Sequence, residues 1–319
     1  MSSIKRVAEK IVIPTPFAVG DVNTYLLKGD ALSLVDAGVN TEQAKEALEW
    51  QLKELGYKLS DIEQVILTHH HSDHCGLVDL FKGKRLSGHE DTQRHLLRDE
   101  TFINEQQEYF TMMAKQFGVP PKLMKYASDA KAVYTYSGST PLTHFLREGD
   151  ELPGHPGWRV METFGHAQGH LSFYHEETAV LIGGDLLLGR ISPNPILESP
   201  KKRGEERVKP LLQLNDSLHR LLDEKLTVVY PGHGDDITEP YQLIEKRLKS
   251  QKERAFYVKS LIGVDRRNVL ELAMQLFPKA VKRDPALALF ETLGQLDYLE
   301  SIHEIESEMV EGVMWYYNK

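Results

Sequence analysis

The sequence predicts a mixed α/β (α+β) protein, and three observations support this fold class. Short β-rich runs alternate with helical patterns through residues 1–239, which predicts one domain of strands and helices. Residues 91–145 interrupt this alternation with a helical insertion. Residues 240–319 then predict three helices and a hairpin, the order of a winged-helix-like domain. A chain of 319 residues is long enough for both domains.

The predicted strands are short runs rich in β-branched and aromatic residues, bounded by turn residues. Gly29-Asp30 lies between two such runs and predicts a hairpin. In chain order, the predicted strands cover residues 11–13, 23–27, 32–36, 64–68, 84–88, 159–164, 171–174, 179–182 and 227–230.

The predicted helices show apolar residues at intervals of three and four positions. Thr41 is a candidate N-cap for the first of them. In chain order, we expect helices over residues 41–56, 76–82, two or three segments of 91–145, 210–222, 240–260, 267–277 and 285–301, and a hairpin over 302–317. Basic residues concentrate in 240–283 and acidic residues in 284–319. The tail therefore either packs as a dipolar helical domain or contacts nucleic acid.

Side chains that can bind metals cluster directly after the strand predicted over 64–68. Four histidines and an aspartate lie within six consecutive residues, from His69 to His74. Imidazole and carboxylate ligands together suit Zn²⁺ and similar transition metals. In an extended segment His69 and His71 share a face, because they are two residues apart. A turn at Asp73 and His74 would aim those side chains at a second point nearby, so one loop can serve two metals.

Other polar residues follow the ends of later predicted strands, at His166, Asp185 and His233. Each is preceded by glycine: Gly165-His166, Gly183-Gly184-Asp185 and Pro231-Gly232-His233. Polar residues thus recur at the ends of predicted strands, at 68–74, 166, 185 and 233.

Net charge, cysteine content and the distribution of apolar residues indicate the partners and the compartment of the protein. The net charge of -9 argues against a protein that coats nucleic acid. The single cysteine, Cys75, permits no intramolecular disulfide, which fits a reducing cytoplasm. The N-terminus leads into no long apolar segment, and no apolar run is long enough to span a membrane. We therefore expect a cytoplasmic protein without membrane contact, and the sequence leaves the oligomeric state open.

In type, order and spacing, His69-x-His71-x-Asp73-His74 and the three later motifs resemble the metallo-β-lactamase fold superfamily. The sequence is most similar to its glyoxalase II-like and β-lactamase-like protein 2-like hydrolases, which carry a C-terminal winged-helix domain. The resemblance implies an αββα sandwich over residues 1–239. The 91–145 insertion is the part that matches least.

Position by position, the resemblance implies two metal ions. It gives the first ion His69, His71 and His166, and gives the second ion Asp73, His74 and His233. Asp185 would bridge both, which makes Asp73 and Asp185 the expected catalytic carboxylates. The ions would be Zn²⁺, with Fe or Mn as alternatives. His170 is expected to hold a ligand or the ligand loop in place, and Asp36 either does the same or forms the turn beneath the metal loop.

Three neighbouring residues have other expected roles. His70 lies between ligands and should point to the opposite side of the loop. Cys75 is expected to be a small packed residue, because the family has no ligand there. Ala167 departs from the threonine that is more usual after the histidine of this motif.

The resemblance implies a metal-dependent hydrolase in which a metal-bound hydroxide attacks a small thioester or ester. The main alternative is a zinc-dependent phosphodiesterase or endoribonuclease that acts on single-stranded RNA. Two further alternatives are a persulfide dioxygenase with one iron ion and a nucleic-acid-binding protein with a vestigial site. A secreted β-lactamase is disfavoured, because no leader segment is evident.

The insertion bears on the choice of substrate. Its apolar residues either form a small core of their own or cover the metal loop as a lid. We expect a lid, which would make the pocket partly apolar and favour a small substrate. The basic run at 201–203 argues for RNA. The apolar residues in question are Tyr109, Phe110, Met112, Met113, Phe117 and Tyr126.

Overall fold

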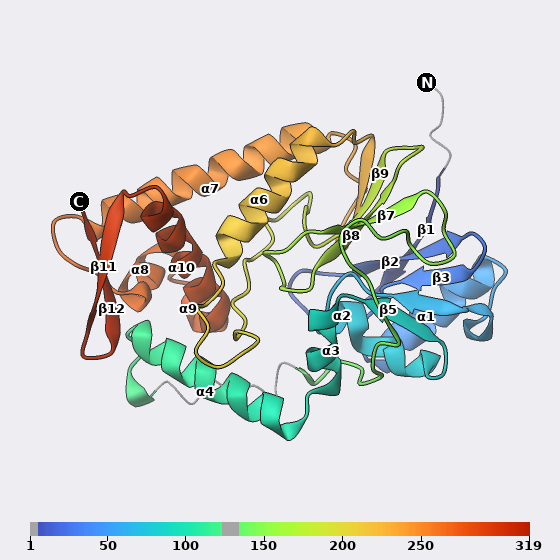
Figure 1. Ribbon diagram of the computed structural model, residues 1–319, viewed down its shortest axis with the longest axis horizontal. Coiled ribbons are helices and arrows are strands. Elements are labelled where there is room, and N and C mark those ends of the chain that lie inside the picture. Colours follow the sequence, from blue (N-terminus) through green and yellow to red (C-terminus); the bar gives the residue numbers. More distant parts are fainter. Residues whose placement is uncertain (1–5, 123–133) are drawn as a thin grey trace.

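The structure is a computed structural model, which describes residues 6–122 and 134–319 (Figure 1). Within these residues the strands form sheets of six, four and two strands. The first sheet has the order β1 (Glu9–Ile13), β2 (Val22–Lys28), β3 (Leu32–Val35), β4 (Gln64–Ile66), β5 (Arg85–Gly88) and β6 (His144–Phe145). The second has the order β10 (Val228–Pro231), β9 (Val180–Gly184), β8 (Leu171–His175) and β7 (Trp158–Glu162).

The two larger sheets pack face to face, and helices cover their outer faces. Tyr25 and Phe173 are both fully buried in the core between the sheets. Helix α1 (Glu42–Glu54) covers the first sheet with Leu48 and Leu52. Helix α6 (Pro210–Asp223) covers the second with Leu214 and Leu218. This αββα arrangement confirms the predicted sandwich.

The pairing of the strands explains why polar residues gather at one edge. Strands β3, β4 and β5 are parallel, as are β9 and β10, so the carboxyl ends of each group lie at the same edge of its sheet. The amide of Leu171 donates to the carbonyl of Thr68 at 2.7 Å, which ties the start of β8 to the loop after β4. The ligand-bearing loops of both sheets therefore meet at this edge.

Short helical segments complete this part of the fold. Helix α2 (Ser72–Cys75) continues the histidine-rich loop, and it is too short for sequence periodicity to reveal. The helix expected over 76–82 is present as the 3₁₀ segment η2 (Gly76–Phe81), and a second such segment is η1 (Leu59–Asp61).

The insertion begins with α3 (Glu90–Leu97) and α4 (Glu100–Gln116). Met113 and Phe117, at the end of α4, are buried in one core with Val269 and Leu293 of the C-terminal helices. Helix α4 therefore neither has a core of its own nor packs chiefly over the metal loop. Its contact is with the C-terminal region, beside which it lies in Figure 1. Tyr126 lies outside the described residues.

The C-terminal region has the predicted order of helices and hairpin. Helix α10 is enclosed by its neighbours, and ten of its residues, among them Glu291 and Asp297, are buried. The winged-helix assignment of this region remains a prediction. The elements are α7 (Pro240–Ile262), α8 (Val269–Leu276), the short α9 (Ala280–Arg283), α10 (Pro285–Ser301), β11 (Ile305–Val310) and β12 (Val313–Asn318). In the described part of the chain, no helix combines the length and apolarity needed to cross a bilayer.

Candidate metal centre

The structure brings all seven predicted ligands together at the shared edge of the sheets. Three overlapping groups have donor atoms within 4.8 Å of one another. They come from four separate segments: the loop and helix after β4, and the loops after β7, β9 and β10. The groups are His69, His71 and His166; Asp73, His74 and His233; and His69, His74 and Asp185.

The first group consists of three imidazoles whose nitrogens face one another. His71 Nδ1 lies 3.0 Å from His69 Nε2 and 2.9 Å from His166 Nε2. Burial lowers the pKa of all three side chains below the usual value for histidine. The rings are therefore neutral at pH 7, the state in which imidazole binds a metal.

The second group combines carboxylates with imidazoles. His233 Nε2 lies 3.3 Å from Asp73 Oδ2 and 3.5 Å from Asp185 Oδ2, and His74 Nε2 lies 3.5 Å from Asp185 Oδ1. Burial by itself lowers the pKa of His233, but Asp185 and Asp73 raise it to about 10. These carboxylates thus require a positive charge beside them, and a bound cation would replace the histidine protons.

Asp185 occupies the position between the groups. Its Oδ2 is 3.5 Å from both His166 Nε2 and His233 Nε2. Among buried polar atoms of the described residues, Asp185 Oδ1, His74 Nε2 and His233 Nε2 make no hydrogen bond. Leaving buried polar atoms unpaired costs about 1–3 kcal/mol each, so this cluster is suited to divalent cations rather than to self-pairing.

The remaining ring nitrogens are fixed by acceptors on the protein. His166 Nδ1 donates to the carbonyl of Asn194 at 2.9 Å, and His233 Nδ1 donates to the carbonyl of Asp21 at 2.8 Å. Each bond selects the tautomer that leaves Nε2 free to face the site. Sequence reasoning missed Asn194 and Asp21, because their backbone carbonyls carry no signature in the side chain.

Asp36 holds the ligand loop from beneath. Its Oδ2 accepts from His74 Nδ1 at 2.7 Å and from the Thr68 hydroxyl at 2.8 Å, while its Oδ1 accepts from the Thr68 amide at 2.8 Å. The residue has a φ of 61°, a left-handed conformation that aspartate adopts at some cost. Asp36 therefore acts both at the turn and on His74, the two roles that the sequence left open.

His170 lies behind Asp185, where the resemblance implied it. Its Nε2 accepts from the Asp185 amide at 3.0 Å, and its Nδ1 contacts the Thr163 hydroxyl at 2.8 Å. Burial lowers the pKa of His170 to about 3, so the ring stays neutral and can accept this bond.

His70 and Cys75 lie apart from the ligand groups, as expected. The His70 ring stacks on His95 with centroids 3.5 Å apart. The Cys75 thiol donates to the His70 carbonyl at 3.1 Å, and burial raises its pKa to about 12. Cys75 is thus a protonated, packed residue.

Gly232 leaves the room that the centre needs. A Cβ atom built on Gly232 would lie 2.1 Å from Asp185 Oδ1 and 2.9 Å from His74 Cε1. Glycine is therefore required by this close approach, and the motif that carries His233 is the signal for it in the sequence.

We expect Gly232→Ala to abolish binding of metal in the second group, because the added methyl displaces Asp185 or occupies the cation's place. Metal content per chain measures this effect. Gly189→Ala is the matched control, since a Cβ there meets nothing within 4 Å. Equal metal content in both variants and the wild type would contradict this account of Gly232.

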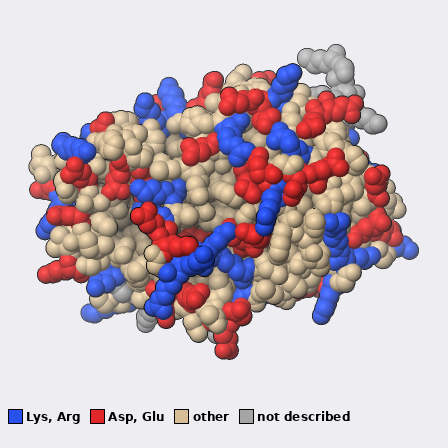
Figure 2. Space-filling view, viewed as in Figure 1, with Lys and Arg blue, Asp and Glu red and all other residues tan. Residues whose placement is uncertain are grey.

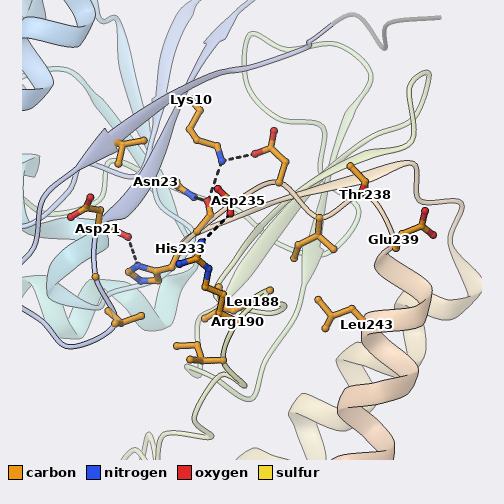
Figure 3. Close-up of a pocket in the computed structure, with 18 residues that line it drawn as sticks. Lys10, Asp21, Asn23, Leu188, Arg190, His233, Asp235, Thr238, Glu239 and Leu243 are labelled. Carbon is orange, nitrogen blue, oxygen red and sulfur yellow. Dashed lines mark hydrogen bonds and ion pairs between the residues drawn. The ribbon is translucent and has the colours of Figure 1, made fainter. Parts of the chain in front are cut away.

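A pocket of about 680 Å³ adjoins His233 (Figure 3). Its walls come from β1, the segment before β2, the loop after Asp185 and the loop after β10, and Leu188 and Arg190 are among the residues drawn in Figure 3. In the described part of the chain, no residue of the 91–145 insertion lines this pocket. For the described residues of the insertion, the expectation that they line the pocket is therefore wrong at the opening beside His233.

Comparison with known proteins agrees with the fold and the site. The profile of the metallo-beta-lactamase superfamily matches residues 18–257. The probable metallo-hydrolase YqjP of Bacillus subtilis is 43% identical over 298 residues, 93% of each chain. A beta-lactamase-like protein 2 homolog of Caenorhabditis elegans is 27% identical over 75% of this chain and 66% of that protein.

Among solved structures, the metallo-beta-lactamase family protein TTHA1429 of Thermus thermophilus superposes with a TM-score of 0.80 at 30% identity. The match covers 98% of this chain and 99% of that one, so it includes both the insertion and the C-terminal helices. The chain therefore belongs to the metallo-beta-lactamase superfamily, and it is one of the metal-dependent hydrolases of that superfamily.

Proposed function

We propose that the protein hydrolyses a small thioester or ester with the help of two metal ions bound at the shared edge of the sheets. Zn²⁺ is the preferred metal. The observation that supports this most is the position of Asp185 between two groups of ligands, where Asp185 Oδ1, His74 Nε2 and His233 Nε2 make no hydrogen bond. One carboxylate shared by two groups is the arrangement of a two-metal site.

The two groups would hold one ion each, with Asp185 common to both. Metal ions bound there would polarise the scissile carbonyl and make water acidic enough to act as a nucleophile near neutral pH. The protein's own residues supply the remainder. The neutral rings of the first group offer lone pairs, while Asp73 and Asp185 balance the cationic charge. Asp36 and the carbonyls of Asp21 and Asn194 keep the rings aimed.

The pocket beside His233 favours a small substrate over a nucleic-acid strand. Lys10 and Arg190 are its basic residues, and they pair with Asp236 and Asp235. Asp21 and Glu239 add negative charge that no lysine or arginine of this lining offsets. Such a wall repels a phosphate backbone. Apolar side chains make up much of the rest, including Val19, Leu188, Ile191 and Leu243.

Two of the three basic residues at 201–203 are paired with acidic side chains. Lys201 pairs with Asp91 at 2.7 Å, and Arg203 pairs with Glu108 at 3.2 Å. On the face shown in Figure 2, aspartate and glutamate lie beside the groups of lysine and arginine. A channel for single-stranded RNA needs a continuous basic track, so these pairs favour the small substrate.

A thioester is the first choice among small acyl compounds. The relative named thioesterase pkgB, from Emericella nidulans, is 25% identical over 79% of this chain, although the match spans 57% of that protein. A thioester and an oxygen ester present the same carbonyl to the centre, and the apolar walls suit an acyl chain.

The proposal is tested first by metal content and then by turnover. Protein purified without chelator should contain about two transition-metal ions per chain, one for each ligand group, as measured by elemental analysis. It should then hydrolyse members of a panel of thioesters and esters at rates that change little with salt, because the pocket offers no excess of basic charge.

Each alternative function predicts a different experimental result. One iron ion per chain would favour the persulfide dioxygenase. Cleavage of RNA, with affinity falling steeply as salt rises, would favour the endoribonuclease. RNA binding without any turnover would favour the vestigial site.

A further inference from the structure

A buried carboxylate outside the seven ligands connects the segments that carry the metal centre. Glu198 belongs to the irregular segment between β9 and α6, and its side chain is 4% exposed. A buried carboxylate is costly unless it is paired and hydrogen-bonded. The partners of Glu198 therefore indicate what this residue does.

Both oxygens of Glu198 accept hydrogen bonds from other segments. Its Oε1 accepts from the Gln168 amide at 2.7 Å. Its Oε2 accepts from His95 Nε2 at 3.1 Å and from an Arg94 guanidinium nitrogen at 3.4 Å. His70 Nε2 lies 3.9 Å from Oε1. The carboxylate thus joins α3, the metal loop and the loop that carries His166.

The contacts of Glu198 with His70, His95 and Gln168 lead to the first group of ligands. His70 lies between His69 and His71 in the chain, and its ring is stacked on His95. Gln168 is two residues from His166. Asn194, whose carbonyl fixes the His166 ring, is four residues before Glu198 on the same irregular segment. The Glu198 carboxylate therefore acts on both sides of the His71–His166 contact.

A third metal ion in this cluster is the competing explanation, because the donor atoms of His70, His95 and Glu198 lie within 4.8 Å of one another. Two observations oppose it. The Arg94 guanidinium already contacts Glu198 Oε2, and a cation beside it would be repelled. The rings of His70 and His95 are parallel to within 15°, which directs their nitrogen lone pairs side by side rather than toward one point.

We propose that Glu198 is a positioning residue that fixes His71 and His166 in the geometry required by the first metal ion. This inference rests on the proposed two-metal function. It predicts that loss of the carboxylate weakens binding of the ion in the first group. Binding of the other ion, by Asp73, His74 and His233, should not change. A general loss of fold would weaken both.

The test uses Glu198→Gln, which has the same shape but places an NH₂ group against the donors of Gln168 or His95. Metal-free protein is titrated with Co²⁺ in competition with a chromophoric chelator, and the absorption spectrum is recorded at each step. We expect one site with wild-type affinity and one weakened about 10- to 100-fold, the range for residues that orient ligands.

The matched control is Glu291→Gln. Glu291 is also buried and paired with an arginine, Arg254, but it lies in α10. Both Co²⁺ affinities of the Glu291→Gln variant should equal those of the wild type. If Glu198→Gln does not fold, His95→Phe keeps the ring stacked on His70 and removes one donor to Glu198, and the same site should weaken by a smaller factor.

Three results overturn the inference. The first is that both sites of the Glu198→Gln variant bind Co²⁺ with wild-type affinity. The second is equal weakening of both sites. The third is a third Co²⁺ ion in the wild type that Glu198→Gln loses. Wild-type protein that binds no Co²⁺ would instead overturn the proposed function on which the inference depends.

Discussion

Asp185→Asn is expected to lower turnover more than about 100-fold, the upper end of the effect of residues that only orient ligands. Of the seven ligands, Asp185 is the carboxylate whose Oδ2 lies 3.5 Å from a histidine of each group, His166 and His233. The amide removes a negative charge and offers one acceptor oxygen instead of two. Both the spacing of the two ions and the balance of charge around them change. Steady-state kinetics with metal content measured on the same sample checks this prediction.

His70→Ala is the comparison for Asp185→Asn, because His70 lies in the same loop but points away from the ligand groups, toward His95 and Glu198. The turnover of His70→Ala should fall by no more than about 10- to 100-fold, the range for residues that act on ligands indirectly. Equal losses in both variants would show that the roles of the two residues have been misassigned.

Asp36→Asn is expected to weaken metal binding by the second group about 10- to 100-fold. Asp36 Oδ2 accepts from His74 Nδ1, which leaves His74 Nε2 as the nitrogen that would bind the metal. An amide NH₂ at that position donates instead, so His74 Nδ1 becomes the acceptor and Nε2 carries the hydrogen. If the amide turns over, its NH₂ faces the Thr68 amide, which then loses its acceptor. Asparagine tolerates the left-handed backbone at this position, which limits the loss of stability.

Asp79→Asn is the matched control for Asp36→Asn. Asp79 Oδ1 likewise accepts from backbone amides, those of Ser139 and Thr140, and from the Thr140 hydroxyl. Asp79 lies outside every group of the described residues that is suited to a metal. Titration with Co²⁺ should show weakening in Asp36→Asn alone. The account of Asp36 fails if the two variants bind Co²⁺ equally.

Through its resemblance to the metallo-β-lactamase superfamily, the sequence by itself predicted the αββα fold and the residues that gather at its edge. The spacing of His69, His71, Asp73 and His74 determines which side chains share a face, and this depends only on local backbone geometry. His166, Asp185 and His233 could be assigned because they match the motifs of the metallo-β-lactamase superfamily, and each follows a predicted strand. The order of the C-terminal helices and hairpin was also evident from periodicity.

The tertiary structure alone decided where the insertion packs. Its apolar residues predict burial but not the partner, since hydrophobic contact has no direction. Met113 and Phe117 could have covered the metal loop, yet they lie against Val269 and Leu293 of the C-terminal helices. As a result, the described insertion leaves the pocket beside His233 to other segments.

The residues that orient the ligands were likewise decided by the tertiary structure. Asp36 could be suspected from its place after a strand, but its bond to His74 depends on a turn with positive φ. Asn194 acts through a carbonyl, and Glu198 meets His95 across 103 residues of chain. Such contacts follow no sequence period, because a hydrogen bond between distant segments depends on where the whole fold places each atom.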